Sequence, residues 1–175
     1  RYAAADAILK EGVRRHPGDD ALLFARGAAL ERQGRLAEAE RLLAKAIEIN
    51  PNNAVALNYL GYMLADRGVN LVEALGYVQR ALALEPKSAA YLDSLGWAQF
   101  RMGLYEEAET NLRAALRYDA SDPTIREHLG DLLQKTGRQT EAVREWQTAL
   151  AGGHEEPERV RRKILKLQSA RPVTP

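Results

Sequence analysis

The feature that most constrains the fold of this chain is a glycine and alanine pattern that recurs four times. A glycine following a large side chain recurs at intervals of 34, 35 and 34 residues, with a second glycine seven residues after it and then two alanines, themselves seven residues apart. A period of this length predicts a stack of supersecondary units rather than one compact fold. The four sets are Gly27, Gly34, Ala39 and Ala46; Gly61, Gly68, Ala74 and Ala81; Gly96, Gly103, Ala108 and Ala115; and Gly130, Gly137, Ala142 and Ala149.

Each repeat has the pattern of two amphipathic helices joined by a turn. We expect the first helix to end just before the second glycine, which can adopt the left-handed backbone of a helix end. Asp19-Asp20 and Asp122-Pro123 have the composition of helix starts. The first glycine and first alanine predict a close approach of the two helices, because a bulky residue there would overpack the contact.

This pattern divides the chain into one partial repeat, four complete repeats and a final helix. Val160, Ile164 and Leu167 give the last segment one apolar stripe, so we expect it to be a helix that caps the array. The boundaries predicted are 1–19 for the partial repeat, which holds a second helix only, then 20–53, 54–88, 89–122 and 123–156, with the capping helix at 157–169 and a tail at 170–175.

Charge and composition exclude several classes of function. The 25 basic and 24 acidic residues give a formal net charge of +1, which argues against a dedicated nucleic-acid binder. The sequence has no cysteine and no apolar run long enough to span a membrane, so we expect no membrane contact by this part of the protein. One basic cluster leaves two interpretations open, the solvated face of the last helix or a contact with an anionic nucleic acid or membrane. It comprises Arg159, Arg161, Arg162, Lys163 and Lys166.

The residues that carry chemistry are sparse. His16 and His154 fall in predicted turns and His128 on a first helix, and none has a second histidine at ligand spacing. Glu106 and Glu107 are adjacent, and adjacent residues on a helix do not face each other. The sequence therefore predicts no enzyme, no metal and no cofactor.

A helix-turn-helix repeat with this glycine, alanine and proline pattern, including Pro51 and Pro86, resembles the tetratricopeptide repeat. The resemblance covers residues 1 to about 151 and implies an all-α, right-handed solenoid whose first helices line a concave groove. The chain departs from the family pattern at Arg26 and Arg126, which replace apolar residues, and at Ala120, which replaces a proline. These departures put single contacts in doubt, not the fold.

The resemblance also implies a peptide-binding groove of aromatic and polar side chains, the usual composition of a recognition patch. For Trp97 and Phe100, burial between helices is an equally open alternative. Some members of the family bind a C-terminal carboxylate with lysines and an arginine at set places, and neither residue type occurs at those places here, so we predict no such clamp. The groove residues are Phe24, Asn58, Tyr62, Asp93, Trp97, Phe100, Arg101, Glu127 and Asp131.

Two classes of function follow from this resemblance. The first is a non-catalytic scaffold or adaptor that binds a protein or peptide, and the second is a substrate-recruiting arm of a larger enzyme whose catalytic domain lies upstream. The stretches "ALNYLGYMLADRG" and "YLDSLGW" also resemble the C-terminal repeats of bacterial cell-envelope tetratricopeptide lipoproteins. Self-association through the first helix is a further hypothesis, because Ile8, Leu9 and Val13 would lack part of a preceding repeat.

Overall fold

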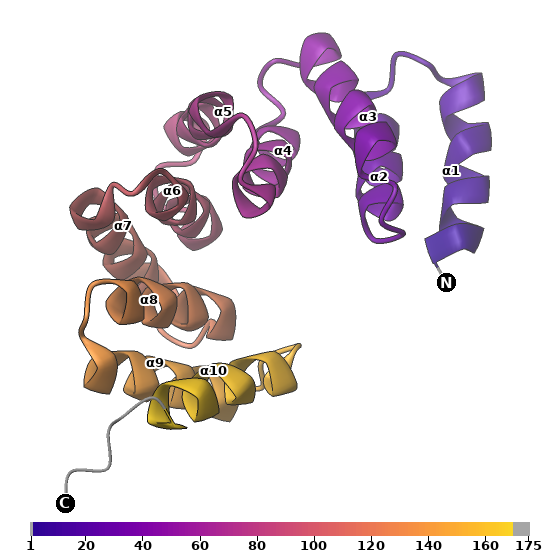
Figure 1. The fold of residues 1–175 in the computed structure, drawn as a ribbon. Helices are drawn as coiled ribbons and strands as arrows, with labels where there is room; N and C mark the ends of the chain where they lie inside the picture. Colours follow the sequence, from indigo (N-terminus) through magenta and orange to yellow (C-terminus); the bar gives the residue numbers. More distant parts are fainter. Residues whose placement is uncertain (1, 170–175) are drawn as a thin grey trace, which may run out of the picture. The chain divides into compact units, whose positions relative to one another are not determined.

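The computed structural model describes residues 2–169, with side chains from residue 6 onward, and these residues form ten α-helices and no strand (Figure 1). The predicted all-α repeat fold is confirmed. The helices are α1 (Tyr2–Arg15), α2 (Asp20–Glu31), α3 (Leu36–Ile49), α4 (Ala54–Arg67), α5 (Leu71–Leu84), α6 (Ala89–Met102), α7 (Tyr105–Tyr118), α8 (Pro123–Lys135), α9 (Gln139–Ala151) and α10 (Pro157–Ser169).

The helices are organised in two compact units, Arg1–Pro86 and Lys87–Pro175. In the first unit α2 pairs with α3 and α4 with α5, and α1 packs against α2. In the second unit α6 pairs with α7 and α8 with α9, and α10 packs against α9. No helix in residues 2–169 combines the length and apolarity that crossing a membrane requires.

Glycines set both the helix ends and the helix crossings, as the repeat predicts. Gly68 and Gly103 cap α4 and α6 with φ of 69° and 82°, the left-handed region that side chains disfavour. At the crossing of α6 with α7, a Cβ on Gly96 would lie 2.7 Å from Cγ of Leu112 and 3.1 Å from the carbonyl oxygen of Ala108. The close approach of paired helices therefore requires a residue without a side chain at this position.

The predicted helix starts are also confirmed. The Asp19 side chain accepts a hydrogen bond from the amide of Leu22 at the start of α2. The Asp122 side chain accepts from the amides of Thr124 and Ile125, and proline occupies the first turn of α8. These carboxylates satisfy amides that have no partner inside the helix.

The two arginines that depart from the family pattern have partners. Nε of Arg26 donates to Oδ1 of Asp6 at 2.9 Å, and both side chains are largely buried. Nη1 of Arg126 lies 2.6 Å from Oε2 of Glu145, and the same guanidinium donates to the carbonyl oxygen of Ala120. An arginine at an apolar position is tolerated because its charge is paired.

Ion pairs recur at one position of the second helices. The fifth residue of α1, α3 and α7 is acidic, and each pairs with an arginine of the next hairpin in its unit. The recurrence joins successive hairpins through equivalent acidic residues, whereas the arginine follows the turn glycine at Arg35 and Arg138 and precedes it at Arg67. The pairs are Asp6 with Arg35 at 2.9 Å, Glu40 with Arg67 at 2.9 Å, and Glu109 with Arg138 at 2.7 Å.

Helix α10 buries the predicted apolar stripe against the second unit. Val160 is fully buried, Leu167 is nearly so, and Ile164 is half-buried against the same core. Ile164 stands where α8 carries Gly130, whose added Cβ would lie 2.5 Å from the Trp146 ring. Because Ile164 has a side chain where α8 has none, α10 cannot cross another helix as closely as α8 crosses α9.

Candidate protein-interaction face

Each unit carries a first-helix face, which we define as the predicted groove side chains on its first helices, α2 and α4 in the first unit and α6 and α8 in the second. In the first unit this face holds an aromatic pair. The rings of Phe24 and Tyr59 meet edge to face with centroids 5.6 Å apart. The Tyr59 hydroxyl donates to Oε2 of Glu31 at 2.9 Å, and burial together with this carboxylate raises the pKa of Tyr59 to about 12. Phe24 is half-buried, so part of its ring stays accessible beside this contact.

Asn58 and Tyr62 lie on α4 in the same unit, and both side chains are half-buried. Oδ1 of Asn58 is buried and accepts no hydrogen bond from the described residues. A buried acceptor without a donor costs roughly 1–3 kcal/mol.

Trp97 forms the centre of an aromatic stack in the second unit. Its ring stacks on His128 with centroids 4.2 Å apart and on Phe100 with centroids 5.1 Å apart. The Arg101 guanidinium lies 5.8 Å from the Trp97 ring centroid, within cation–π range. Trp97 is only 8% exposed, whereas Phe100 and Arg101 are half-buried. Of the two alternatives, Trp97 is buried between helices and Phe100 keeps an accessible part.

Asp93 and His128 form a buried pair beneath this stack. Nδ1 of His128 lies 2.8 and 3.0 Å from the two carboxylate oxygens of Asp93. Burial alone would lower the pKa of His128, but the Asp93 carboxylate outweighs burial and raises that pKa above its ordinary value. Asp93 thus links α6 to α8 and has little surface to offer a partner.

Glu127 is the most deeply buried carboxylate of the face, with 1% of its side chain exposed. Nη2 of Arg159 and Nζ of Lys163 each lie 2.6 Å from its oxygens. Nε2 of His154 lies 2.8 Å from Oε2, an ion-pair distance without hydrogen-bond geometry. Burial opposes the charge, but Arg159 and Lys163 prevail and lower the pKa of Glu127 to about 2.

Asp131 shares this network. Its carboxylate accepts a hydrogen bond from Nε1 of Trp146 at 3.0 Å and lies 2.5 Å from Nζ of Lys163. Burial, helped by the nearby Glu127 charge, raises the pKa of Asp131 although Lys163 acts in the opposite direction. Glu127 and Asp131 therefore hold α10 on α8, and their carboxylates are engaged within the protein.

The basic cluster of α10 divides into two sets. Arg159 and Lys163 belong to the buried network, and Arg161 pairs with Glu158 on the surface of the helix. Arg162 and Lys166 are exposed and have no ion-pair partner in residues 6–169. The cluster is thus only partly a solvated face, since two of its members lock the helix in place.

An open hollow of about 350 Å³ lies beside this network, and we call it the lysine hollow. It collects residues from α6, α8, α9 and α10, including the predicted groove residues Phe100 and Asp131. Sequence analysis singled out Lys163 and Lys166 in the basic cluster, but it did not place them with Lys135, because Lys135 lies on another helix that only the fold brings near. The lining residues are Phe100, Asp131, Gln134, Lys135, Trp146, Lys163, Lys166 and Leu167.

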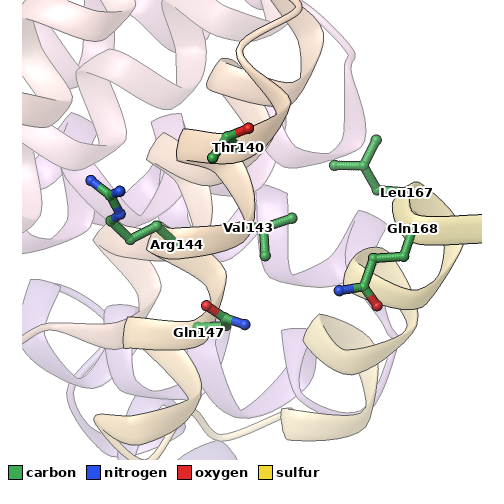
Figure 2. Close-up of a pocket in the computed structure, with 6 residues that line it drawn as sticks. All are labelled: Thr140, Val143, Arg144, Gln147, Leu167 and Gln168. Carbon is green, nitrogen blue, oxygen red and sulfur yellow. The ribbon is translucent and has the colours of Figure 1, made fainter. Parts of the chain in front are cut away.

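A second hollow, of about 330 Å³, opens between α9 and α10 (Figure 2). In Figure 2 the side chains of Val143 and Gln147 extend from α9 toward Gln168 on α10, whereas Arg144 points away. None of the predicted groove residues lines it. Within residues 6–169, no three His, Asp or Glu side chains form a group that could hold a metal ion.

Comparison with known proteins identifies the repeats. Profiles of the tetratricopeptide repeat match residues 21–53, 42–75 and 94–156. The chain belongs to the tetratricopeptide repeat family. The glycine crossings and left-handed helix ends described above are thus those of tetratricopeptide hairpins.

Three curated proteins are similar to parts of this chain. The TPR repeat-containing protein PA4667 of Pseudomonas aeruginosa is 41% identical over 124 residues, which is 70% of this chain and 21% of that protein. Cellulose synthase 1 operon protein C of Komagataeibacter xylinus is 30% identical over a match that covers 83% of this chain and 12% of that protein. The probable UDP-N-acetylglucosamine--peptide N-acetylglucosaminyltransferase SPINDLY of Petunia hybrida is 33% identical over a match that covers 49% of this chain and 9% of that protein. The chain spans about a fifth or less of each relative.

Solved structures show the same tetratricopeptide fold. The thermophilic TPR protein TTC0263 of Thermus thermophilus superposes with a TM-score of 0.81 over 97% of this chain and 91% of that one, at 21% identity. PilW, a type IV pilus biogenesis factor, gives a TM-score of 0.82 over 96% and 79%, at 19% identity. At these identities the likeness concerns the fold alone.

Proposed function

We propose that the first-helix face binds an extended segment of a partner protein without chemistry of its own. Tetratricopeptide repeats support a protein-interaction scaffold in general, and the proposal assigns that role to particular side chains. The observation that carries it is the aromatic surface of the first unit, where Phe24 on α2 and Tyr62 on α4 are both half-buried and keep accessible surface. An extended segment supplies side chains that can pack on this aromatic surface.

We divide the predicted groove residues by the accessibility of their side chains. Phe24, Asn58, Tyr62, Phe100 and Arg101 keep accessible surface and are the proposed contacts. The remaining side chains are buried or engaged and are proposed to position the contacts. Those positioning residues are Asp93, Trp97, Glu127 and Asp131.

A specific observation favours the second candidate function, a substrate-recruiting arm of a larger enzyme. SPINDLY is named as a peptide N-acetylglucosaminyltransferase, and this chain matches 9% of its length. The same face would then hold a polypeptide substrate for a catalytic domain elsewhere in the protein.

Photo-crosslinking tests the proposed contacts. A photoreactive amino acid replaces Phe24 or Tyr62 in one set of variants and Val72 or Tyr118, exposed on second helices, in the control set. We expect partner adducts from the first-helix positions and none from Val72 or Tyr118. Adducts that form only at the second-helix positions would show that the partner binds the opposite face.

A further inference from the structure

The lysine hollow has an uncompensated positive charge. Within it, Lys163 is neutralised by Asp131 and Glu127. Lys135 ends α8 and Lys166 lies on α10, and both side chains are exposed with no ion-pair partner in the described part of the chain. Two ammonium groups therefore face one opening without carboxylates to balance them.

The same hollow offers apolar surface beside this charge. Phe100 is half-buried and supplies accessible apolar surface, and Leu167 and Trp146, which are 7% and 1% exposed, form the buried core beneath it. Gln134 adds an amide that can donate a hydrogen bond. Its complement is an anionic group next to an apolar side chain.

We infer that the lysine hollow binds a side-chain carboxylate of an acidic partner segment, with the neighbouring apolar side chain of that segment against Phe100 and Leu167. The inference rests on the proposed function, because it names the chemistry of the segment bound at that face. Lysine is a point charge on a flexible stem, so it neutralises a carboxylate without fixing its orientation.

Two features favour a side-chain carboxylate over other anions. Capture of a chain terminus uses converging backbone N–H groups, but the end of α8 at Lys135 presents carbonyl groups. A nucleic acid or membrane surface needs many cations over a wide area. Here the formal net charge is +1 and the excess ammonium groups line a concave, partly apolar site.

Fluorescence anisotropy with a defined probe tests this inference. The probe is a short, labelled peptide in which glutamate alternates with leucine and phenylalanine, with an amidated C-terminus. We expect Lys135→Glu/Lys166→Glu to weaken its binding at least about tenfold, which corresponds to about 1.4 kcal/mol. Lys45→Glu/Lys87→Glu makes the same charge change at exposed sites outside the hollow and should leave binding unchanged. Circular dichroism checks that all variants are folded.

The peptide supplies independent controls. Replacing its glutamates by glutamines, or its leucines and phenylalanines by serines, should each weaken binding to the wild-type protein. Equal binding to both lysine variants would overturn the inference, and so would binding that requires a free C-terminal carboxylate. Duplex DNA or anionic vesicles that bind as tightly as the peptide, with the same dependence on Lys135 and Lys166, would also overturn it.

The failure of this inference can be told apart from failure of the proposed function. Partner adducts at Phe24 or Tyr62 together with no preference for the acidic peptide would overturn the inference about the lysine hollow and support the proposed function of the first-helix face. Acidic peptide binding that depends on Lys135 and Lys166, with no adducts at the first-helix positions, would support the inference about the lysine hollow and contradict the proposed function of the first-helix face.

Discussion

Glu127 illustrates how a buried charge shapes this surface. Its carboxylate is almost inaccessible, and it stays ionised because Arg159 and Lys163 reach it from α10. Removing these partners would leave an uncompensated buried charge and would strongly destabilise the folded state. At this scale, the residues of α10 decide which acidic side chains of α8 can meet a partner.

Glu127→Gln should therefore destabilise the second unit by roughly 3 kcal/mol at neutral pH, since the pKa of Glu127 falls from 4.5 to about 2 on folding. The folded pKa is the lower one, so the stabilisation is present above 4.5 and is lost as the pH falls toward 2. Urea unfolding across this range measures it. Exposed Glu107→Gln is the control and should change little. Identical acid profiles for wild type and Glu127→Gln would contradict this account.

His128 should produce the opposite pH dependence. Because Asp93 raises the pKa of His128 on folding, its contribution is complete below 6.5 and is lost as the pH rises through the folded pKa. Glu127 and Asp131 also face it and act in the same direction. Stability should therefore fall across this window in the wild type and less in His128→Asn, with exposed His16→Asn as the control. An unchanged slope in His128→Asn would refute the assignment.

At the scale of helices, crossings and turns depend on local sequence and could be predicted. Gly68 and Gly103 end helices because the left-handed backbone suits glycine, which the sequence itself shows. Side-chain partners could not be predicted in this way. The carboxylate of Glu127 meets Arg159, 32 residues away, and Trp97 stacks on a histidine of another helix. Such contacts depend on how hairpins stack, which no local pattern records.

Two glycine substitutions in the first unit distinguish the effect of a tight helix crossing on stability from the effect of helix propensity. A Cβ at Gly61 would lie 2.6 Å from Cγ2 of Val78 and 2.8 Å from the carbonyl oxygen of Ala74, so Gly61→Ala should cost about 1–3 kcal/mol. Gly76 lies within α5 and has nothing within 4 Å of its would-be Cβ, so Gly76→Ala should stabilise by about 0.5–1 kcal/mol. Thermal unfolding measures both, and effects of the same sign would be incompatible with a tight α4–α5 crossing.

At the scale of the whole molecule, the tetratricopeptide array gives two units that each carry a first-helix face. The family and the helix ends follow from sequence periodicity, and the caps at Asp19 and Asp122 follow from residue type, whereas the caps at Asn53 and Ser88 were not predicted. The division of the predicted face into accessible contacts and buried supports does not follow from the sequence, because α10 covers Glu127 and Asp131 only in the folded unit. Self-association through α1 stays a prediction. Ile8 is 75% exposed, and sedimentation measures the oligomeric state.

The central claim is that accessible aromatic residues of the first helices bind the partner. The most direct measurement compares partner capture from a lysate of the source organism by wild type, Phe24→Ala/Tyr62→Ala and the second-helix control Val72→Ala/Tyr118→Ala, with circular dichroism on each. We expect the first-helix variant to lose at least about tenfold in affinity, because truncating a central interface aromatic costs about 2 kcal/mol or more. The control should bind like wild type. Equal capture by a folded Phe24→Ala/Tyr62→Ala variant would contradict the account.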